Sequence, residues 1–257
     1  MQEFLQQCLI VCPLIFLAGF VDSVAGGGGL ISLPAYLFVG IPTHIAAGTN
    51  KVVNGVGTFF AAAKYIKSGK VELRSAVWAA LGALVGAALG ARLALLFSEA
   101  ALKTIILLAL PCAAVFLTVK KDFGDDANVK KRDRGAVQGV VLSILIGMLL
   151  GCYDGLIGPG TGTFMIMAFT AVLGMNLLTA SGCAKVANLA SNVASAVVWM
   201  LDGKVLWALA LPAAICSILG NLCGARYAIR GGSKKVRAMI FVVLGLLFLK
   251  LGWELLF

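Results

Sequence analysis

The sequence has few charged residues, few aromatic residues and a single histidine. Only 12% of its 257 residues are charged and 9% are aromatic, whereas 61% are hydrophobic. A soluble domain carries about 25% charged residues, and so little polar surface cannot cover a soluble globule. The composition therefore excludes a soluble enzyme, a disordered chain and a small secreted domain held by disulfides. It predicts an all-α polytopic integral membrane protein.

Patterns typical of catalysis or metal binding are also missing. The seven cysteines lie in apolar segments without a paired CxxC spacing, so we interpret them as buried thiols that pack as small hydrophobic side chains. One histidine, with no nucleophile–base pair and no metal-ligand spacing, argues against a catalytic triad or a zinc site. We expect neither an enzyme nor a cofactor or metal.

Three segments account for the net charge of +10. Residues 64–74, 120–134 and 226–237 carry 15 of the 21 Lys and Arg residues but only 5 of the 11 Asp and Glu residues. No basic patch interleaved with exposed aromatic residues is visible, so no nucleic-acid partner is expected. Because basic loops of membrane proteins stay in the cytoplasm, we predict that these three loops are cytoplasmic.

The apolar pattern predicts about ten helical segments. Six long stretches can each cross about 30 Å of hydrocarbon, and they lie near 5–24, 75–97, 101–119, 136–153, 205–225 and 238–253. Two less regular regions each hold a short apolar piece (29–40 and 162–174) followed by a longer helix-like piece (45–66 and 179–201). Whether the short pieces span the bilayer or re-enter stays open at this point.

The two halves of the sequence repeat each other. GFVDSVAGGGG from Gly19 matches GCYDGLIGPGT from Gly151, and TNKVVN from Thr49 matches CAKVAN from Cys183. We divide the chain into a first transmembrane repeat (1–119), a charged linker (120–134) and a second transmembrane repeat (135–257). Equivalent loops carry opposite charge bias, which favours inverted repeats of five crossings each. If the short pieces re-enter, each repeat has four crossings and the repeats are parallel.

Four charged residues lie inside the apolar regions, at equivalent places in the two repeats. They are Asp22 and Lys51 in the first half, and Asp154 and Lys185 in the second. Ionisable groups at membrane depth are costly, so they pair, face water or bind a ligand. One interpretation is two structural Asp–Lys pairs; the other is a polar cavity in which Asp22 and Asp154 carry a coupling proton.

Glycine clusters follow both aspartates, and each precedes a short apolar piece. A helix that starts at such a break points free N–H groups and its positive dipole end at a bound anion; the alternative is a tight packing turn. The candidate anion-binding glycines are Gly26, Gly27, Gly28, Gly29, Gly158 and Gly160.

Amide and hydroxyl donors accompany the two lysines at helical spacing. Lys51 and Asn54 lie three positions apart, and Lys185 and Asn188 repeat that spacing. A lysine with such donors suits a small oxyanion, although the same groups can serve as interhelical hydrogen bonds. The remaining candidates of this kind are Asn50 and Ser191, and Asn192, four positions after Asn188, adds a further donor.

Glycines spaced four apart predict close helix packing. They lie at Gly82, Gly86 and Gly90, and again at Gly220 and Gly224. This pattern packs helices within a chain or between chains, so a homodimer through these helices is one expectation.

The motifs AGFVDSVAGGGGLISLP, GTNK and YDGLIGPGTG resemble the TauE/SafE family of membrane transporters, also called 4-toluene sulfonate uptake permeases. The likeness runs from about residue 17 to residue 249 and is strongest to the YfcA-like group. It implies a secondary transporter of sulfite, organosulfonates or related small anions in the bacterial inner membrane. Motif positions carried over include Asp22, Lys51, Asp154, Pro159 and Lys185; Ala184 stands opposite Asn50, so the site is not perfectly symmetric.

The sequence therefore predicts a secondary transporter whose small anionic substrate lies between the two glycine-rich breaks. An anion channel would use similar residues without alternating access, and a membrane-embedded enzyme is the alternative of a different class. The substrate, the direction of transport and the coupling ion are left open.

Overall fold

The computed structural model describes residues 2–105, 136–156 and 158–256, and in these ranges the chain is helical apart from short connections. Among the described residues, six helices are long and two are short, and residues 99–105 are helical as well. The long ones are α1 (Gln2–Ala25), α3 (Thr43–Lys67), α4 (Leu73–Leu96), α6 (Ala136–Leu156), α8 (Leu177–Leu201) and α9 (Trp207–Leu256). The short ones are α2 (Gly29–Phe38) and α7 (Thr161–Leu173). The prediction of an all-α protein is confirmed.

In the part of the chain that the structure describes, five helices are long and apolar enough to cross a membrane. These segments are Phe4–Ala25, Leu73–Leu96, Val137–Leu156, Leu177–Leu201 and Trp207–Val242. Helix α3 has 25 residues, as α8 does, but it carries Asn50, Lys51 and two basic residues in its last turn, which lower its hydropathy. Most of the predicted stretch 101–119 and the whole linker 120–134 lie outside the described residues.

Helix α9 is interrupted once. Gly232 has φ 65° and ψ −166°, a conformation that belongs to no helix and that glycine adopts without steric cost. The basic segment 226–237, predicted as a loop, is helical on both sides of this break, because Arg, Lys and Ala are good helix formers. The expectation of two separate apolar stretches is thus correct, but the connection between them is a bend rather than a loop.

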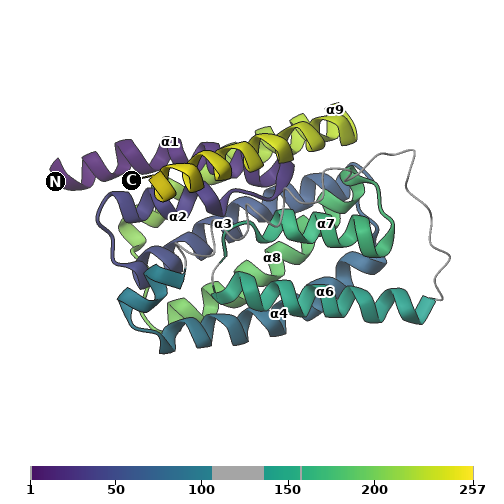
Figure 1. The fold of residues 1–257 in the computed structure, drawn as a ribbon, viewed down its shortest axis with the longest axis horizontal. Helices are drawn as coiled ribbons and strands as arrows, with labels where there is room; N and C mark the ends of the chain where they lie inside the picture. The colour runs from purple at the N-terminus through teal and green to yellow at the C-terminus, as the bar shows by residue number, and fades with distance from the viewer. Residues whose placement is uncertain (1, 106–135, 157, 257) are drawn as a thin grey trace.

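Small residues set the closest helix contacts. Gly82, Gly86 and Gly90 of α4 lie against the backbone of α6, where an added Cβ would overlap carbonyl oxygens of Ile144, Met148 and Cys152 respectively. On the other side of the molecule, Gly220 and Gly224 of α9 lie against the backbone of α1. Figure 1 shows α4 beside α6 at one edge and α1 beside α9 at the opposite edge. The glycine spacing therefore packs helices within the chain, and a homodimer stays a prediction that these glycines no longer support.

These contacts also give the directions of the helices. The glycines of α4 meet successive turns of α6 in the same order, so α4 and α6 run parallel, and α1 and α9 do so for the same reason. In contrast, Gly48 lies against Trp199 near the end of α8 whereas Gly55 lies against Asn192, so α3 and α8 are antiparallel. Opposite directions for equivalent elements are what inverted repeats require. The inverted membrane topology itself stays a prediction.

The short helices return the chain between long ones. At 1.5 Å per residue, the 10 residues of α2 and the 13 of α7 cover about 15 and 20 Å, less than the hydrocarbon thickness of about 30 Å. Helix α3 runs parallel to α9, because Thr49 accepts a hydrogen bond from the backbone of Leu206 and Gly57 lies against Ser217. Since α1 is also parallel to α9, α2 and its flanking turns carry the chain back before α3 begins.

Candidate functional site

The two glycine-rich breaks touch each other. The first break lies between α1 and α2 and the second between α6 and α7, and both include glycines with positive φ: Gly26 (78°), Gly158 (90°) and Gly160 (82°). The Thr163 N–H donates to the Gly26 carbonyl oxygen (3.3 Å), and the Thr163 hydroxyl donates to the Ala25 carbonyl oxygen (2.7 Å). A side chain on either Gly26 or Gly162 would overlap the other residue's backbone, so only glycine allows this crossing.

The predicted glycines Gly27, Gly29 and Gly160 lie where the two short helices begin. The Gly27 carbonyl oxygen accepts from the Leu30 N–H (3.1 Å), which belongs to the first turn of α2. Gly29 begins α2 and packs against Pro159, and Gly160 is the residue before α7. A substrate between the two breaks, as the sequence predicts, would require these crossing segments to separate.

The four charged residues of the apolar regions form two ion pairs, and each pair joins the two repeats. The Lys185 ammonium lies 2.6 Å from Oδ2 of Asp22, and the Lys51 ammonium lies 2.9 Å from Oδ2 of Asp154. Each aspartate therefore finds its lysine in the other half of the chain. Pairing of this kind satisfies charges that would otherwise be costly at membrane depth.

The Lys51–Asp154 pair is shielded from solvent. Its side chains are 6% and 4% exposed, and the Lys51 ammonium also donates to the Asp154 carbonyl oxygen. The Ser191 hydroxyl donates to Oδ2 of Asp154 at 2.6 Å. Gly158 lies next to the Lys51 ammonium. Ser191, predicted to orient a substrate, thus holds the carboxylate of the pair.

The Lys185–Asp22 pair has fewer partners. Lys185 is completely buried, and Asp22 is its partner among the described residues. The Asp22 side chain is 15% exposed and accepts a long hydrogen bond of 3.4 Å from the N–H of Gly28. One of the glycine-loop N–H groups predicted to bind an anion therefore faces a carboxylate of the protein.

The predicted asparagines lie in rows along α3 and α8. The Asn54 side-chain amide donates to Oδ1 of Asn50 (3.1 Å), and the Asn192 amide donates to Oδ1 of Asn188 (3.1 Å). Asn192 is expected as a further donor from its spacing of four from Asn188. Thr163 was missed, because its equivalent in the first repeat is the apolar Ile31.

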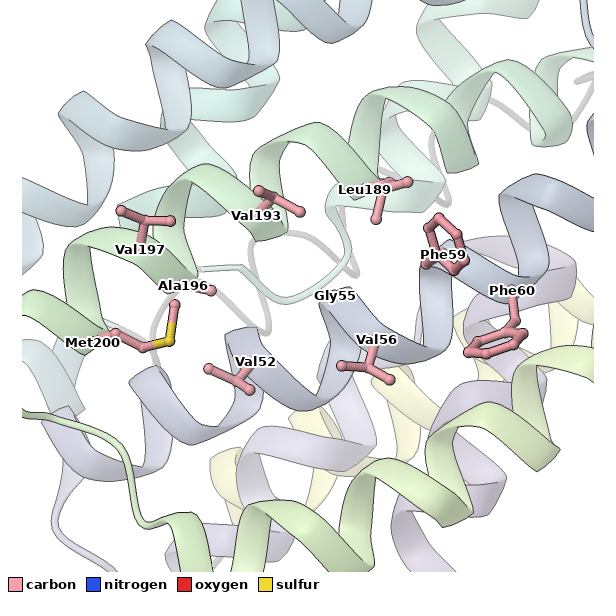
Figure 2. Close-up of a pocket in the computed structure, with 10 residues that line it drawn as sticks. All are labelled: Val52, Gly55, Val56, Phe59, Phe60, Leu189, Val193, Ala196, Val197 and Met200. Carbon is pink, nitrogen blue, oxygen red and sulfur yellow. The ribbon is translucent and has the colours of Figure 1, made fainter.

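An apolar groove lies beside this polar site, since Gly55 of its lining is next to Asn192. It has a volume of about 350 Å³ and lies between α3 and α8 (Figure 2). Figure 2 shows Val52, Val56 and Phe59 of α3 together with Val193 and Val197 of α8 along it. Every predicted site residue is absent from its lining. Its position between two helices, with half-exposed apolar side chains, is typical of a surface that faces lipid.

Metal ligands do not gather in the part of the chain that the structure describes. No group of three or more His, Cys, Asp or Glu residues there could hold a metal ion. What the site offers is two ammonium groups, hydroxyl and amide donors and two carboxylates, a set suited to anions and protons rather than to metal ions.

The comparisons with known proteins point to transport. A family model described as Sulfite exporter TauE/SafE matches residues 11–251. The chain is 37% identical to the probable membrane transporter protein ORF9 of a Sinorhizobium species, over 89% of this chain and 85% of the relative. It is 32% identical to a probable membrane transporter protein of Haemophilus influenzae, over 93% and 92% of the two chains. It is 30% identical to the probable membrane transporter protein YfcA of Escherichia coli K12, over 98% and 93%. No solved structure matches the chain.

Proposed function

This chain belongs to the sulfite exporter TauE/SafE family of membrane transporters, and on that premise we propose that it is a secondary transporter of small sulfur-containing anions such as sulfite or an organosulfonate. The family and the relatives named as probable membrane transporters support transport across a membrane. The proposal itself adds four points: the anion as substrate, a coupling proton, the inner membrane and the cytoplasmic position of the basic loops.

The observation that carries the proposal is the way the two carboxylates are held. Asp22 lies between the Lys185 ammonium and the Gly28 N–H, and Asp154 accepts from both Lys51 and Ser191. A carboxylate and a small sulfur oxyanion share a negative charge and oxygens that accept charge-assisted hydrogen bonds. In this proposal each aspartate occupies the donors that a substrate anion uses during transport.

The replacement of an aspartate by the substrate anion also explains why a proton would be transported. When an anion takes the ammonium of Lys185 or Lys51, the released carboxylate is left at membrane depth without its partner. An unpaired buried charge is costly, and a proton taken up by the aspartate removes that charge. Anion and proton would then move together, with Asp22 and Asp154 as the proton carriers. Unchanged pH dependence of transport in both Asp22→Asn and Asp154→Asn would contradict this role.

The proposed substrate can be tested by measuring whether small sulfur anions bind to the purified protein. Sulfite, thiosulfate and a small alkyl sulfonate should each be added while the melting temperature is recorded, because a ligand of the native state raises it with concentration. We expect a concentration-dependent rise for at least one of them, and its loss in Lys51→Ala and Lys185→Ala. Lys67→Ala, which removes an exposed lysine from the end of α3, should keep the rise.

Two results would overturn the proposal. One is wild-type affinity for these anions in folded preparations of both lysine variants. The other is flux through proteoliposomes that never accumulates the anion against its gradient under an imposed proton gradient, which is the behaviour of a channel.

A further inference from the structure

Three thiols lie together where α1 meets α9, away from the two ion pairs. The Cys12 thiol lies beside the thiols of Cys8 and Cys216. All three side chains are partly accessible, and none is in a disulfide. The proposed transport mechanism makes no use of them.

The register of the two helices places Cys12 opposite Cys216. Helices α1 and α9 run parallel, and Gly220 meets the backbone of Phe16 while Gly224 meets that of Phe20. One turn before the Gly220 contact, the same register brings Cys216 to Cys12. The glycines let the two backbones approach closely, which is the condition that a disulfide places on its two Cα atoms, about 4.4–6.8 Å apart.

Only one of the neighbouring thiol pairs suits a disulfide. Cys8 and Cys12 are four apart on one helix, which separates their Cβ atoms by about 5–6 Å. A disulfide needs Cβ atoms about 3.8 Å apart. Cys12 and Cys216 come from two packed helices whose small movements adjust this distance, so they form the pair that can close.

A buried hydroxyl faces the same place. Tyr36 of α2 is completely buried, and its hydroxyl has no hydrogen-bond partner among the described residues. It lies near the thiols of Cys12 and Cys216, so a third helix, α2, adjoins the same pair.

We infer that Cys12 and Cys216 are an oxidation site, at which a reversible disulfide links α1 to α9. Both S–H bonds break and one S–S bond forms. Two protons and two electrons pass to an oxidant of the disulfide class, which leaves as two thiols, or to a diazene, which leaves as a hydrazine. Because α1 belongs to the first repeat and α9 to the second, the bond fixes the two halves to each other covalently.

The experiment uses the full-length protein, purified in detergent, reduced and then treated with diamide, a membrane-permeant diazene. After denaturation, a maleimide–polyethylene glycol reagent counts the free thiols on a gel. We expect a loss of two of the seven thiols, restored by a reductant, and a peptide pair joined through Cys12 and Cys216 in the mass spectrum. Cys216→Ala and Cys12→Ala should each keep their remaining six thiols. Cys223→Ala, which removes an exposed thiol of α9, should still lose two.

Three outcomes would overturn the inference: a wild-type protein that keeps seven thiols, a cross-linked peptide that joins Cys8 instead, and loss of two thiols from Cys216→Ala. Each is scored on material that melts cooperatively, and Cys12→Ala gives a second reading if Cys216→Ala does not fold. Anion binding and transport play no part in these readouts, so failure here is separate from failure of the proposed function.

Discussion

At the scale of single residues, the ion pairs make the charges of the bundle depend on one another. Lys185 is completely buried and contacts Asp22 at 2.6 Å, so removal of one partner leaves the other uncompensated in an apolar environment. Such a loss costs about 3–5 kcal/mol, whereas removal of both charges costs much less.

We therefore expect Lys185→Ala to lower the free energy of unfolding strongly and Asp22→Asn with Lys185→Gln to recover most of it. Thermal or denaturant unfolding in one detergent measures both. The double variant should remain unable to bind the anion, which separates stability from function. A double variant as unstable as Lys185→Ala would show that the pair acts through packing rather than through charge.

Two serines on α8 provide a second comparison. The Ser191 hydroxyl donates to Asp154 at 2.6 Å, whereas the equally buried Ser195 hydroxyl has no partner among the described residues. Because hydrogen bonds to charged groups are worth about 1.5–3 kcal/mol, Ser191→Ala should destabilise the protein by about that amount. Ser195→Ala should change stability little. Equal losses in the two variants, measured by unfolding, would argue against a role of Ser191 in holding Asp154.

The sequence is informative about which residues are charged but not about their partners. Asp22 and Lys51 can be predicted as special because they interrupt an otherwise uncharged apolar region. The pairing is different, because Asp22 and Lys185 are 163 positions apart and only the packing of the two halves brings them together. Local spacing predicts the asparagine rows of α3 and α8 for the opposite reason, since residues four apart on a helix are neighbours.

At the scale of elements, the glycine faces decide how closely helices pack. A Cβ on Gly86 would overlap the Met148 carbonyl oxygen of α6, so Gly86→Ala should push α4 and α6 apart. Overpacking of this kind costs about 1–3 kcal/mol. Gly139 of α6 has open space around it, and Gly139→Ala should be neutral or stabilise its helix by up to about 1 kcal/mol. Unfolding of the two variants side by side checks this, and a stable Gly86→Ala would contradict the contact.

The start of α3 carries a pH-dependent contact. Glu99 accepts from the N–H groups of Thr43 (2.7 Å) and His44 (3.2 Å) and lies 2.6 Å from the His44 ring. Burial alone would raise the pKa of Glu99, but the hydrogen bonds from His44 and Thr43 outweigh it and hold the pKa below its ordinary value of 4.5. A carboxylate whose pKa falls on folding stabilises the native state above its unfolded pKa, and this contribution is lost as the pH drops through the folded value.

We expect Glu99→Gln to melt at a lower temperature than the wild type near neutral pH. The difference should shrink as the pH falls below about 4.5, because the wild-type carboxylate then takes up its proton. Melting curves between about pH 3 and pH 7 measure it. A difference that stays constant over this range would show that the contact does not depend on the charge of Glu99.

The positions of the helices can be predicted from the lengths of the apolar stretches. The residues at which the helices end depend on local conformation, which composition does not show. The expected stretches 5–24, 75–97 and 179–201 agree with α1, α4 and α8 within a few residues. The first α9 segment continues past the expected end at residue 225, because a run of basic residues is compatible with either a loop or a helix. Gly232, rather than the charge, ends that segment.

At the scale of the whole molecule, the directions of α3 and α8 bear on membrane topology. Ser68 follows the last residue of α3 and Asp202 follows that of α8, and the antiparallel packing puts them at opposite ends of the bundle. We expect cysteines placed at these two positions, in a variant without reactive native thiols, to be labelled from opposite sides of the membrane. Asp202 is a better position than Gly203, whose φ of 68° disfavours a side chain. Labelling of both from one side would rule out the inverted topology.

The two ion pairs also make each half of the chain depend on the other half. Each half contains one aspartate and one lysine whose partners lie in the other half. A single half embedded in a bilayer would hold two unpaired charges, and two copies of that half would satisfy all four. A half produced on its own would therefore need a second copy of itself to pair both of its charges in this way. The two halves are nevertheless not identical at the site, as Ala184 opposite Asn50 illustrates.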